Sequence, residues 1–403
     1  MPCRSSFRPQ FPVMMKNQFA SASALLWICG VGLRLGVLAV PPVISLIQAD
    51  LQMSGTEIGI LSGLPVVLFA VAAAPGSRLV GWAGVRLTLA TGLVVTALGS
   101  GLRALAPEVY SLYAATILMS AGIAIMQPAM ASAVRQWMPD RAAFGTALYT
   151  SGLIVGEIVP VVLMLPVLLP LFDQSWRLGL LSWSAPLLVI AAVVLIFCPR
   201  GNGGASTAAR GTWWPDLRSG LNWQIGLILA GASSVYFSTN AFLPAFLESV
   251  GHGSKVSVAL TTVNVSQLPA VLLLVFLADW IQGKRWPLLA FCGLTVLGVL
   301  GVMVSTAWWM IALSAGVIGM ASAAQLAIGL SLPPLLARNP DDVAHVIAAA
   351  FAISYSYTMG VSFVSGVAWD LAGAPVFAFI PIFIAGLPSV FVALKISFEQ
   401  RTV

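Results

Sequence analysis

Two short polar stretches, one in each half of the chain, resemble each other. The first reads Gly76-Ser-Arg78-Leu-Val-Gly-Trp-Ala-Gly84-Val-Arg86, and the second reads Leu277-Ala-Asp279-Trp-Ile-Gln-Gly283-Lys284-Arg285. Each combines glycine with basic residues, and each follows the second of a series of long apolar segments. This correspondence predicts that the chain contains an internal repeat.

The segments that flank the two stretches are too apolar for a water-soluble protein. Of the 403 residues, 59% are hydrophobic and only 8% are charged, and the mean hydropathy is +0.97. Soluble proteins carry about 25% charged residues. The composition therefore predicts a membrane protein surrounded by the lipid bilayer and excludes disordered and fibrous classes. The basic residues are scattered through short loops without forming a basic face, so no nucleic acid is expected as a partner.

A helix that crosses the hydrocarbon of a bilayer needs about 20 mostly apolar residues. The sequence divides into twelve such segments: 22–47, 57–77, 86–105, 108–132, 142–169, 176–197, 223–248, 255–278, 286–305, 307–334, 343–369 and 373–396. The long polar interruption at 198–222 is rich in Gly, Ser and Arg, which predicts a cytoplasmic linker between six-helix halves at 22–197 and 223–396. Residues 1–21 and 397–403 are expected as cytoplasmic termini. We therefore expect an all-α membrane protein with twelve transmembrane helices in two pseudo-symmetric six-helix bundles.

The distribution of basic residues predicts which side of the membrane each loop faces, because short cytoplasmic loops carry an excess of Lys and Arg. If the termini and the even-numbered loops share one side, that side holds 15 of the 19 Lys and Arg residues. The opposite side keeps Arg103, Arg177 and Lys255, and Arg34 lies within a span. Acidic residues gather in the loops of that opposite side: Asp50, Glu57, Glu108, Asp173, Glu248 and Asp370. Both termini are therefore expected in the cytoplasm of a bacterial cell, with the protein in the inner membrane.

Motifs for enzymatic chemistry and for cofactors are missing from the sequence. The four cysteines stand far apart without a CxxC spacing, and the two histidines have no His or Cys nearby. A disulfide framework and a metal site are therefore not expected. The sequence also contains no GxxxxGK[ST], GxSxG or HExxH motif, so we expect neither an enzyme nor a bound cofactor. No Ala-x-Ala cleavage pattern precedes the first span, which we expect to be retained.

The two repeated stretches resemble the loop motif of the major facilitator superfamily, Gly-x-Leu-Ala-Asp-Arg-x-Gly-Arg-Arg, which follows the second helix and, more weakly, the eighth. The first stretch here lacks the Asp, and the second keeps Leu277-Ala-Asp279 with one extra residue before Gly283. Together with twelve spans and a central linker, the resemblance implies the fold of that superfamily. In that fold the first, fourth, seventh and tenth helices line a central cavity.

Several further stretches resemble the cyanate and 2-nitroimidazole transporter family. Leu33-Arg34-Leu35 is followed by Pro41-Pro42 and by Ile60-Leu-Ser-Gly-Leu-Pro65, and that family has an Arg inside helix one and a Leu-Pro in helix two. Other similar stretches are Gly101-Leu-Arg103, Gly122-Ile-Ala-Ile-Met-Gln127 and Asn222-Trp223-Gln224. The resemblance implies movement of a small polar solute. The substrate and the direction of transport differ among family members and do not follow from it.

Arg34 is the basic residue expected deepest in the membrane. It lies 12 residues into its span, which is near the midplane at about 1.5 Å per residue. Insertion scales put the cost of an Arg there at about 2.5 to 3.5 kcal/mol, so it needs a compensating role. Its planar guanidinium has five donors and stays charged, which suits a small anion or a carboxylate. We expect Arg34 to bind substrate; the alternative is a buried Arg held by an internal acid or by backbone carbonyls.

Glu157 is the acid expected deepest within a span, in Gly152-Leu-Ile-Val-Gly156-Glu157-Ile-Val-Pro160. A carboxyl group in such a place can load and release protons. If Glu157 pairs with Arg34 in the empty state, its protonation frees the guanidinium for an incoming anion and couples proton movement to anion movement. The alternative is that Glu157 only holds helices together, through a hydrogen bond between helices or through an ion pair with Arg34. The family resemblance does not predict an acid at this position. Gly152 and Gly156 are expected to let helices approach closely.

Neutral polar residues on other spans would complete the binding site. Tyr236 and Asn240 lie at i and i+4 on the seventh span, and Asn264 and Gln267 lie at i and i+3 on the eighth, so each pair shares a helix face. We expect Tyr236, Asn240 and Asn264 opposite Arg34. Further candidates on other spans are Gln127, Gln325 and Tyr355. For each of these residues the alternative is a hydrogen bond between helices, worth about 0.6 kcal/mol on average.

Three charged residues near the ends of spans are candidate gating residues. Arg86 and Asp279 belong to the two repeated stretches, and His345 follows an acidic pair at the start of the eleventh span. A solvated helix entrance is the alternative for His345. Arg103, near the end of the third span, ranks lower as a binding residue, because extension of its side chain to the outer membrane interface explains its position.

The sequence thus predicts a secondary active transporter that works by alternating access, since the absence of a nucleotide-binding motif leaves gradients as its energy source. The preferred substrate is a small anion or small polar nitrogen compound, similar to cyanate, held by Arg34 and imported, with proton coupling. Efflux of a small toxic or drug-like compound such as a nitroimidazole stays open. A channel or a sensor that does not transport is a further alternative. Beyond the substrate and the bilayer no partner is expected, and the protein is expected to be a monomer.

Overall fold

The structure consists of helices in two groups that follow each other along the chain. The computed structural model of the protein describes residues 16–71, 73–198, 218–276, 284–336 and 342–396, and these residues contain no strand. The first group comprises α1 (Lys16–Leu35), η1 (Pro41–Val43), α2 (Ile44–Leu51), α3 (Gly55–Val71), α4 (Ala73–Ala104), α5 (Val109–Trp137), η2 (Pro139–Arg141), α6 (Ala142–Leu163), η3 (Met164–Leu168), α7 (Leu169–Leu171), α8 (Trp176–Ser182) and α9 (Ser184–Phe197).

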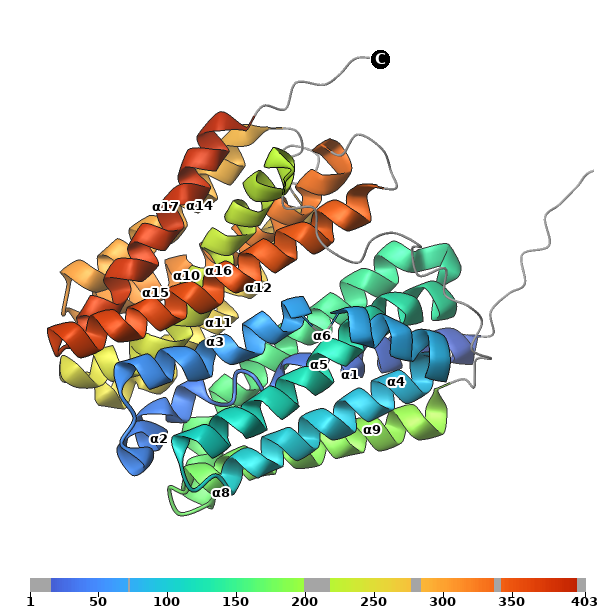
Figure 1. The fold of residues 1–403 in the computed structure, drawn as a ribbon, viewed down its shortest axis with the longest axis horizontal. Helices are drawn as coiled ribbons and strands as arrows, with labels where there is room; N and C mark the ends of the chain where they lie inside the picture. Colours follow the sequence, from blue (N-terminus) through green and yellow to red (C-terminus); the bar gives the residue numbers. More distant parts are fainter. Residues whose placement is uncertain (1–15, 72, 199–217, 277–283, 337–341, 397–403) are drawn as a thin grey trace, which may run out of the picture.

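The second group follows the segment expected as a linker, most of which lies outside the described residues. It comprises α10 (Gly220–Ser249), η4 (Gly253–Lys255), α11 (Val256–Val265), α12 (Gln267–Phe276), α14 (Arg285–Val304), α15 (Trp308–Leu336), α16 (Asp342–Ala372), η5 (Pro375–Ala378) and α17 (Phe379–Lys395). Figure 1 shows the blue-to-green helices of the first group beside the yellow-to-red helices of the second. We call the two groups the N-terminal half and the C-terminal half.

The described helices agree with the expected number of spans. Ten helical segments are long and apolar enough to cross a membrane. Two shorter apolar helices, Phe19–Leu35 and Gly55–Phe69, correspond to the first and second expected spans. The expectation of an all-helical protein with twelve membrane spans in two halves is therefore confirmed.

The first span is broken, although the sequence analysis expected one helix over 22–47. The α-helical part α1 ends at Leu35, and helix resumes only at Pro41 with η1 and α2. Pro41 and Pro42 lack a backbone N–H, so the ladder of hydrogen bonds cannot run through them. The interruption before the paired prolines places Arg34 beside the break.

The first repeated stretch contains a break between two helical pieces, at the place where the turn between the second and third spans was expected. The helix α4 begins at Ala73 and contains one break, at Gly84, where φ is 78° and ψ is 170°. Glycine adopts a positive φ without the steric cost that a Cβ would add. The second repeated stretch lies almost entirely outside the described residues.

Glycines bring α1 and α6 close enough for their backbones to touch. A Cβ at Gly152 would collide with a backbone carbonyl oxygen of α1, and a Cβ at Gly156 would collide with the carbonyl oxygen of Val31. These contacts confirm the expected packing role of both glycines. Arg34 follows Val31 by about one helical turn, and Glu157 is the neighbour of Gly156, so the crossing brings their side chains together.

Gly156→Ala is expected to destabilise the protein, because the added methyl group must push the two backbones apart. Overpacking of this kind costs about 1 to 3 kcal/mol, so the melting temperature in detergent should fall. Gly293 on α14 is a matched control, since a Cβ there meets nothing within 4 Å. Gly293→Ala should leave the melting temperature unchanged or raise it, because Ala is the better helix former. Equal melting temperatures for the two variants would contradict the close crossing.

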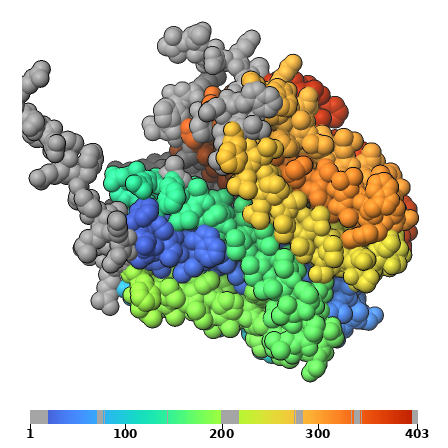
Figure 2. All heavy atoms as spheres, turned by 180° about the vertical axis from the view of Figure 1, so that it is seen from behind, coloured from blue at the N-terminus to red at the C-terminus, as the bar shows by residue number. Residues whose placement is uncertain are grey.

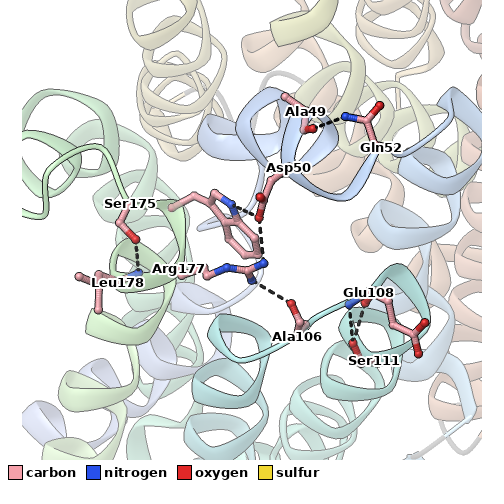
Figure 3. A network of polar contacts seen from close by, with 10 residues as sticks. Ala49, Asp50, Gln52, Ala106, Glu108, Ser111, Ser175, Arg177 and Leu178 are labelled. Atoms are coloured by element: carbon pink, nitrogen blue, oxygen red, sulfur yellow. Dashed lines mark hydrogen bonds and ion pairs between the residues drawn. The ribbon is translucent and has the colours of Figure 1, made fainter.

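Polar contacts tie three segments of the N-terminal half together at one end of the molecule (Figure 3). Asp50, at the end of α2, accepts hydrogen bonds from Arg177 Nη2 at 2.8 Å and from Trp176 Nε1 at 3.1 Å. Arg177 Nη1 also donates to the carbonyl oxygen of Ala106 at 2.8 Å. The ion pair is partly exposed and is therefore worth about 0 to 1 kcal/mol. Its role is geometric, because it fixes the second part of the broken span to α8.

The two halves meet along α3 and α16. A Cβ at Gly59 of α3 would collide with the carbonyl oxygen of Ser362 of α16, so these helices are also in backbone contact. At the start of α3, Asp370 of α16 accepts hydrogen bonds from the backbone N–H groups of Gly55 at 2.6 Å and Thr56 at 2.8 Å, and from the Thr56 hydroxyl at 2.5 Å. A carboxylate at a helix N-terminus also interacts favourably with the helix dipole.

A second contact between the halves joins α6 to α11. Figure 2 shows it from behind, where the green of α6 borders the yellow of α11. In Figure 1 the two halves lie close together at the end that carries α2 and diverge toward the end where α1 begins and α9 ends. We call the end with Asp370 the closed end of the molecule.

Asp370→Ala is expected to open the closed end more often, because three hydrogen bonds to a carboxylate are lost. Hydrogen bonds to charged groups contribute about 1.5 to 3 kcal/mol each. The measurement is labelling of Ser62→Cys, in a background without the four native cysteines, by a membrane-impermeant maleimide. Labelling should be at least about tenfold faster in the Asp370→Ala variant, and Thr56→Val, which removes one bond, should give a smaller increase. An unchanged labelling rate would contradict the role of Asp370 in keeping the closed end shut.

Candidate functional site

The centre of the candidate site is a buried ion pair between two helices of the N-terminal half. Nε of Arg34, in the last turn of α1, lies 3.5 Å from Oε1 of Glu157 on α6. The side chains of the two residues are only 15% and 10% exposed. The pairing that was considered as a hypothesis from the sequence is therefore present. Removing one partner of a buried pair costs about 3 to 5 kcal/mol, since the other charge stays buried without compensation.

Aromatic side chains from three other helices surround the guanidinium of Arg34. Its Cζ atom lies 5.3 Å from the ring centre of Phe69 on α3 and 5.7 Å from that of Phe237 on α10, both within cation–π distance. The hydroxyl of Tyr355 on α16 is a further close neighbour of the guanidinium. Phe237 and Tyr355 belong to the C-terminal half. Arg34 therefore lies at the boundary between the halves.

The second oxygen of Glu157 is held by the C-terminal half. Oε2 accepts hydrogen bonds from the hydroxyl of Tyr236 on α10 at 3.0 Å and from Nε2 of Gln267 on α12 at 3.3 Å. Gln267 Nε2 also lies 3.1 Å from the Tyr236 hydroxyl. A single carboxylate is thus bound by a cation of its own half and by two neutral donors of the other half. Its charge state can therefore influence how the two halves are held together.

The polar network continues from Tyr236 into α11. The Tyr236 hydroxyl lies 2.6 Å from Oδ1 of Asn264, and Nδ2 of Asn264 donates to Oδ1 of Asn240 at 2.9 Å. Asn240 in turn donates to the backbone carbonyl of Tyr236 at 2.9 Å. A hydroxyl has one proton to donate, so Tyr236 can serve either Glu157 or Asn264 at a given moment. The hydroxyl is a point at which the network can switch between two patterns.

Six of the residues singled out from the sequence thus form one buried cluster around Arg34. We call it the central network, and it consists of Arg34, Glu157, Tyr236, Asn240, Asn264 and Gln267. Tyr355 lies at its edge beside Arg34. Tyr236 and Asn240 were predicted to share one helix face, and Asn264 and Gln267 another. All four residues are found in the network.

Two amides predicted for the binding site lie elsewhere. Gln127 is half-buried on α5 and is not part of the central network. Gln325 is fully buried on α15, and its Nε2 donates to the carbonyl oxygen of Ile228 on α10 at 2.9 Å. A Cβ at Gly231 of α10 would lie 2.9 Å from that same Nε2 atom. Gln325 therefore joins α15 to α10 within the C-terminal half, which is the packing alternative considered for it.

The three candidate gating residues are not brought together by the described part of the structure. Arg86 donates from Nη2 to the carbonyl oxygen of Leu195 on α9, a contact within the N-terminal half. His345 is exposed near the start of α16. Asp279 lies outside the described residues. A gating role for these residues stays a prediction.

Arg103 was expected at the outer membrane interface, and this expectation is wrong. Its side chain is buried, with 1% exposure, in the last turn of α4. Nη2 donates to the carbonyl oxygen of Gly36 at 2.9 Å and lies 3.1 Å from Oγ of Ser100. Gly36 belongs to the break in the first span, where backbone carbonyls have lost their helical partners. The break turns Arg103 inward, and the proline pair at 41–42 is the only signal of it in the sequence.

Comparison with known families identifies the fold. A family model described as Major Facilitator Superfamily matches residues 26–365. The chain belongs to this superfamily. Among solved structures, the D-xylose-proton symporter is 14% identical with a TM-score of 0.73, and the match covers 95% of this chain and 99% of that chain. A bacterial homolog of the human lysosomal transporter Spinster, inward-facing and unoccupied, is also 14% identical with a TM-score of 0.73, over 94% of this chain and 96% of that one.

The curated relatives of this superfamily member are transporters. An uncharacterized transporter of Bacillus subtilis (strain 168), YycB, is 26% identical over 77% of each chain. The 2-nitroimidazole transporter of Escherichia coli (strain K12) is 24% identical over 84% of this chain and 86% of its own. The cyanate transport protein CynX of the same organism is 24% identical over 67% and 71%. This superfamily member is therefore a multi-pass membrane protein from a family of transporters, and its relatives include the family suggested by its sequence.

The resemblance implied a cavity lined by the first, fourth, seventh and tenth spans, and two of these, the first and the seventh, contribute to the central network. The network also includes the candidates that the sequence placed on the fifth and eighth spans. The glycine contacts between α1 and α6 explain the contribution of the fifth span, because they bring Glu157 to Arg34.

Within the described residues, no three His, Cys, Asp or Glu side chains cluster as metal ligands would.

Proposed function

We propose that this superfamily member is a secondary active transporter of a small monovalent anion or a small polar nitrogen compound, similar to cyanate, and that Arg34 is the substrate anchor. One observation carries the proposal. Nη1 of Arg34 is buried and has no hydrogen-bond partner among the described residues, while Nε faces Glu157. A guanidinium has five N–H donors in a planar fork, which matches the oxygens of a small anion. An unused donor at the boundary between the halves is available to a substrate.

The surroundings of Arg34 support a compact substrate. The rings of Phe69 and Phe237 flank the guanidinium, so a ligand there meets aromatic faces together with one cation. Small linear or flat groups fit such a site better than large hydrated ones. Two relatives, a cyanate transport protein and a 2-nitroimidazole transporter, agree with this substrate class.

We further propose that Glu157 couples transport to protons. Protonation removes the negative charge that holds Arg34 and weakens the acceptor that binds Tyr236 and Gln267 of the other half. The titratable and charged groups that face Glu157 and Arg34 are Tyr236, Tyr355 and, from α6, Tyr149. One proton on Glu157 and one monovalent anion on Arg34 neutralise each other. Proton and anion can then cross together without net charge movement.

Alternating access gives this coupling its structural basis. With both termini in the cytoplasm, as the distribution of basic residues indicates, the closed end carries the extracellular loops. The structure then corresponds to an inward-facing state in a bacterial inner membrane. Asp370 and the contact of α3 with α16 hold the outer side shut, and the central network lies between the halves that must separate on the other side.

A second candidate function is efflux of a flat toxic compound such as a nitroimidazole. The observation that favours it is the pair of rings at 5.3 and 5.7 Å from Arg34, between which a heteroaromatic ligand could stack. The direction of transport distinguishes the two candidates, since cyanate import and nitroimidazole export predict opposite substrate gradients.

Counterflow in proteoliposomes tests the proposed function. Vesicles are loaded with unlabelled cyanate, and uptake of labelled cyanate is followed, with nitrate, small carboxylates and 2-nitroimidazole as competitors. A transporter gives saturable, stoichiometric exchange, whereas a channel does not. Thermal unfolding in the presence of each compound is a parallel assay, because a ligand at a hundredfold excess over its Kd stabilises the folded state by about 2.7 kcal/mol. No exchange and no stabilisation with any small anion would refute the anion proposal, and activity with 2-nitroimidazole alone would favour the second candidate.

A further inference from the structure

A second buried arginine lies beside a cavity between the central network and the closed end. Arg103 lines this cavity together with three other polar side chains, Ser62 of α3, Thr116 of α5 and Asn240 of α10. Apolar side chains, among them Phe237, form the rest of its wall. We call it the Arg103 cavity. Neither Arg34 nor Glu157 lines it, so it does not contain the ion pair of the site proposed above, and Asn240 is the member of the central network that it shares.

The Arg103 cavity adjoins the central network at two points. Asn240, a member of the network, lines the cavity and accepts a hydrogen bond from Asn264. Phe237 lines the cavity and also flanks the guanidinium of Arg34. A ligand in the cavity is therefore separated from Arg34 by the ring of Phe237.

The charge of Arg103 has no opposite charge among the described residues. The ion pairs among those residues join Arg34 to Glu157 and Arg177 to Asp50. The partners of Arg103 are neutral, a backbone carbonyl and the hydroxyl of Ser100, and its Nε has no hydrogen-bond partner in the described part of the chain. Arg stays protonated when it is buried. A buried cation without a counter-charge is unfavourable, so a mobile anion is the missing partner that the geometry indicates.

We propose that the Arg103 cavity is a second anion-binding site, with Arg103 as its cationic anchor and a small monovalent anion as its ligand. The anion class rests on the function proposed above for Arg34. Nε of Arg103 supplies an unused donor, and the Asn240 amide and the Thr116 hydroxyl provide further polar surface. The site holds the anion on the outer side of Phe237. The anion would occupy this site before it contacts Arg34 during import, and after that contact during export.

The test measures anion binding after the first site has been removed. Thermal unfolding of the purified full-length protein in detergent is followed while potassium cyanate replaces potassium gluconate at constant ionic strength. The Arg34→Gln variant should keep a saturable rise of the melting temperature with cyanate, shifted to concentrations at least about tenfold higher than in the wild type. The Arg34→Gln/Arg103→Gln variant should lose the rise completely. Arg34→Gln/Arg177→Gln is the matched control, since Arg177 lies at the surface, and it should behave like Arg34→Gln alone.

A cavity-filling variant keeps the test decisive if loss of Arg103 prevents folding. Ala241 is buried and lines the cavity, so Ala241→Val fills part of it while Arg103 stays in place. In the Arg34→Gln background this change should also remove the residual cyanate response. If Arg34→Gln alone removes the whole response, the second site is refuted and the Arg34 site stands. If Arg34→Gln leaves the wild-type response unchanged, the proposed function of Arg34 fails instead. A response that survives both Arg103→Gln and Ala241→Val would overturn the assignment of the cavity.

Discussion

Arg34→Gln is expected to reduce cyanate counterflow by about 100-fold or more while the protein still reaches the membrane. The substitution removes the only cation of the central network and with it the unused donor at Nη1. Charge-assisted hydrogen bonds are roughly twice as strong as neutral ones. A loss of about 2.7 kcal/mol of binding free energy corresponds to the 100-fold change. The measurement is the initial rate of counterflow per reconstituted protein.

A structural role of Arg34 must be separated from substrate binding, because Arg34→Gln also leaves the carboxylate of Glu157 without its cation. The double variant Arg34→Gln/Glu157→Gln removes both charges. Its melting temperature should recover toward that of the wild type, as expected when the two charges interact directly. Its counterflow should stay lost. Recovered counterflow in the double variant would mean that Arg34 serves only to neutralise Glu157.

Arg34→Lys refines the same prediction. Lysine keeps the positive charge but presents a compact ammonium group in place of a planar fork. Counterflow should therefore be intermediate between the wild type and Arg34→Gln. Wild-type activity in Arg34→Lys would show that charge alone is sufficient and that the geometry of the guanidinium is unimportant.

The fold could be predicted from the sequence because it depends on properties that are local in the chain. Span length, the repeated stretches at 76–86 and 277–285, and the excess of basic residues in alternate loops each require only a short window. The boundaries of the sixth span, predicted as 176–197, agree with the described helical segment Trp176–Phe197. The broken first span was harder, since the paired prolines predict a bend but not the length of the interruption.

Helix periodicity made it possible to predict from the sequence which polar residues of the site share a helix face. Tyr236 with Asn240, and Asn264 with Gln267, were placed on shared faces by their spacing, and the structure brings them together. Periodicity does not say which neighbour a face meets. Gln325 faces a helix of its own half, because the packing of α15 on α10 decides its direction.

Arg103 shows the limit of depth estimates from sequence. Its position near the end of a span predicted an easy path to water. The interruption in the first span supplies a free carbonyl at Gly36 that competes successfully for the guanidinium. Contacts of this kind, between residues 67 positions apart, depend on how helices stack and leave no local pattern.

Glu157→Gln is expected to abolish the accumulation of cyanate that a pH gradient drives, while counterflow without a gradient is kept within a few-fold of the wild type. The amide is uncharged, so it resembles the protonated carboxyl group, and its carbonyl oxygen can still accept from Tyr236 or Gln267. The variant cannot release a proton on either side. Substrate can still cross, but the proton gradient no longer supplies energy. The measurement compares accumulation in proteoliposomes with an acidic exterior to exchange in the absence of a pH gradient.

Tyr236→Phe is the control that separates the charge of Glu157 from its contacts with the other half. The variant removes the hydrogen bond from the Tyr236 hydroxyl to Glu157 but leaves the carboxylate and its pairing with Arg34. Coupling should therefore persist, with a changed transport rate because one bond between the halves is lost. If Glu157→Gln still accumulates substrate with the pH gradient, the proton is carried elsewhere and Glu157 serves to orient Arg34. If Tyr236→Phe also loses accumulation, the hydroxyl takes part in proton transfer, since its other hydrogen-bond partners among the described side chains, Asn264 and Gln267, carry no titratable group.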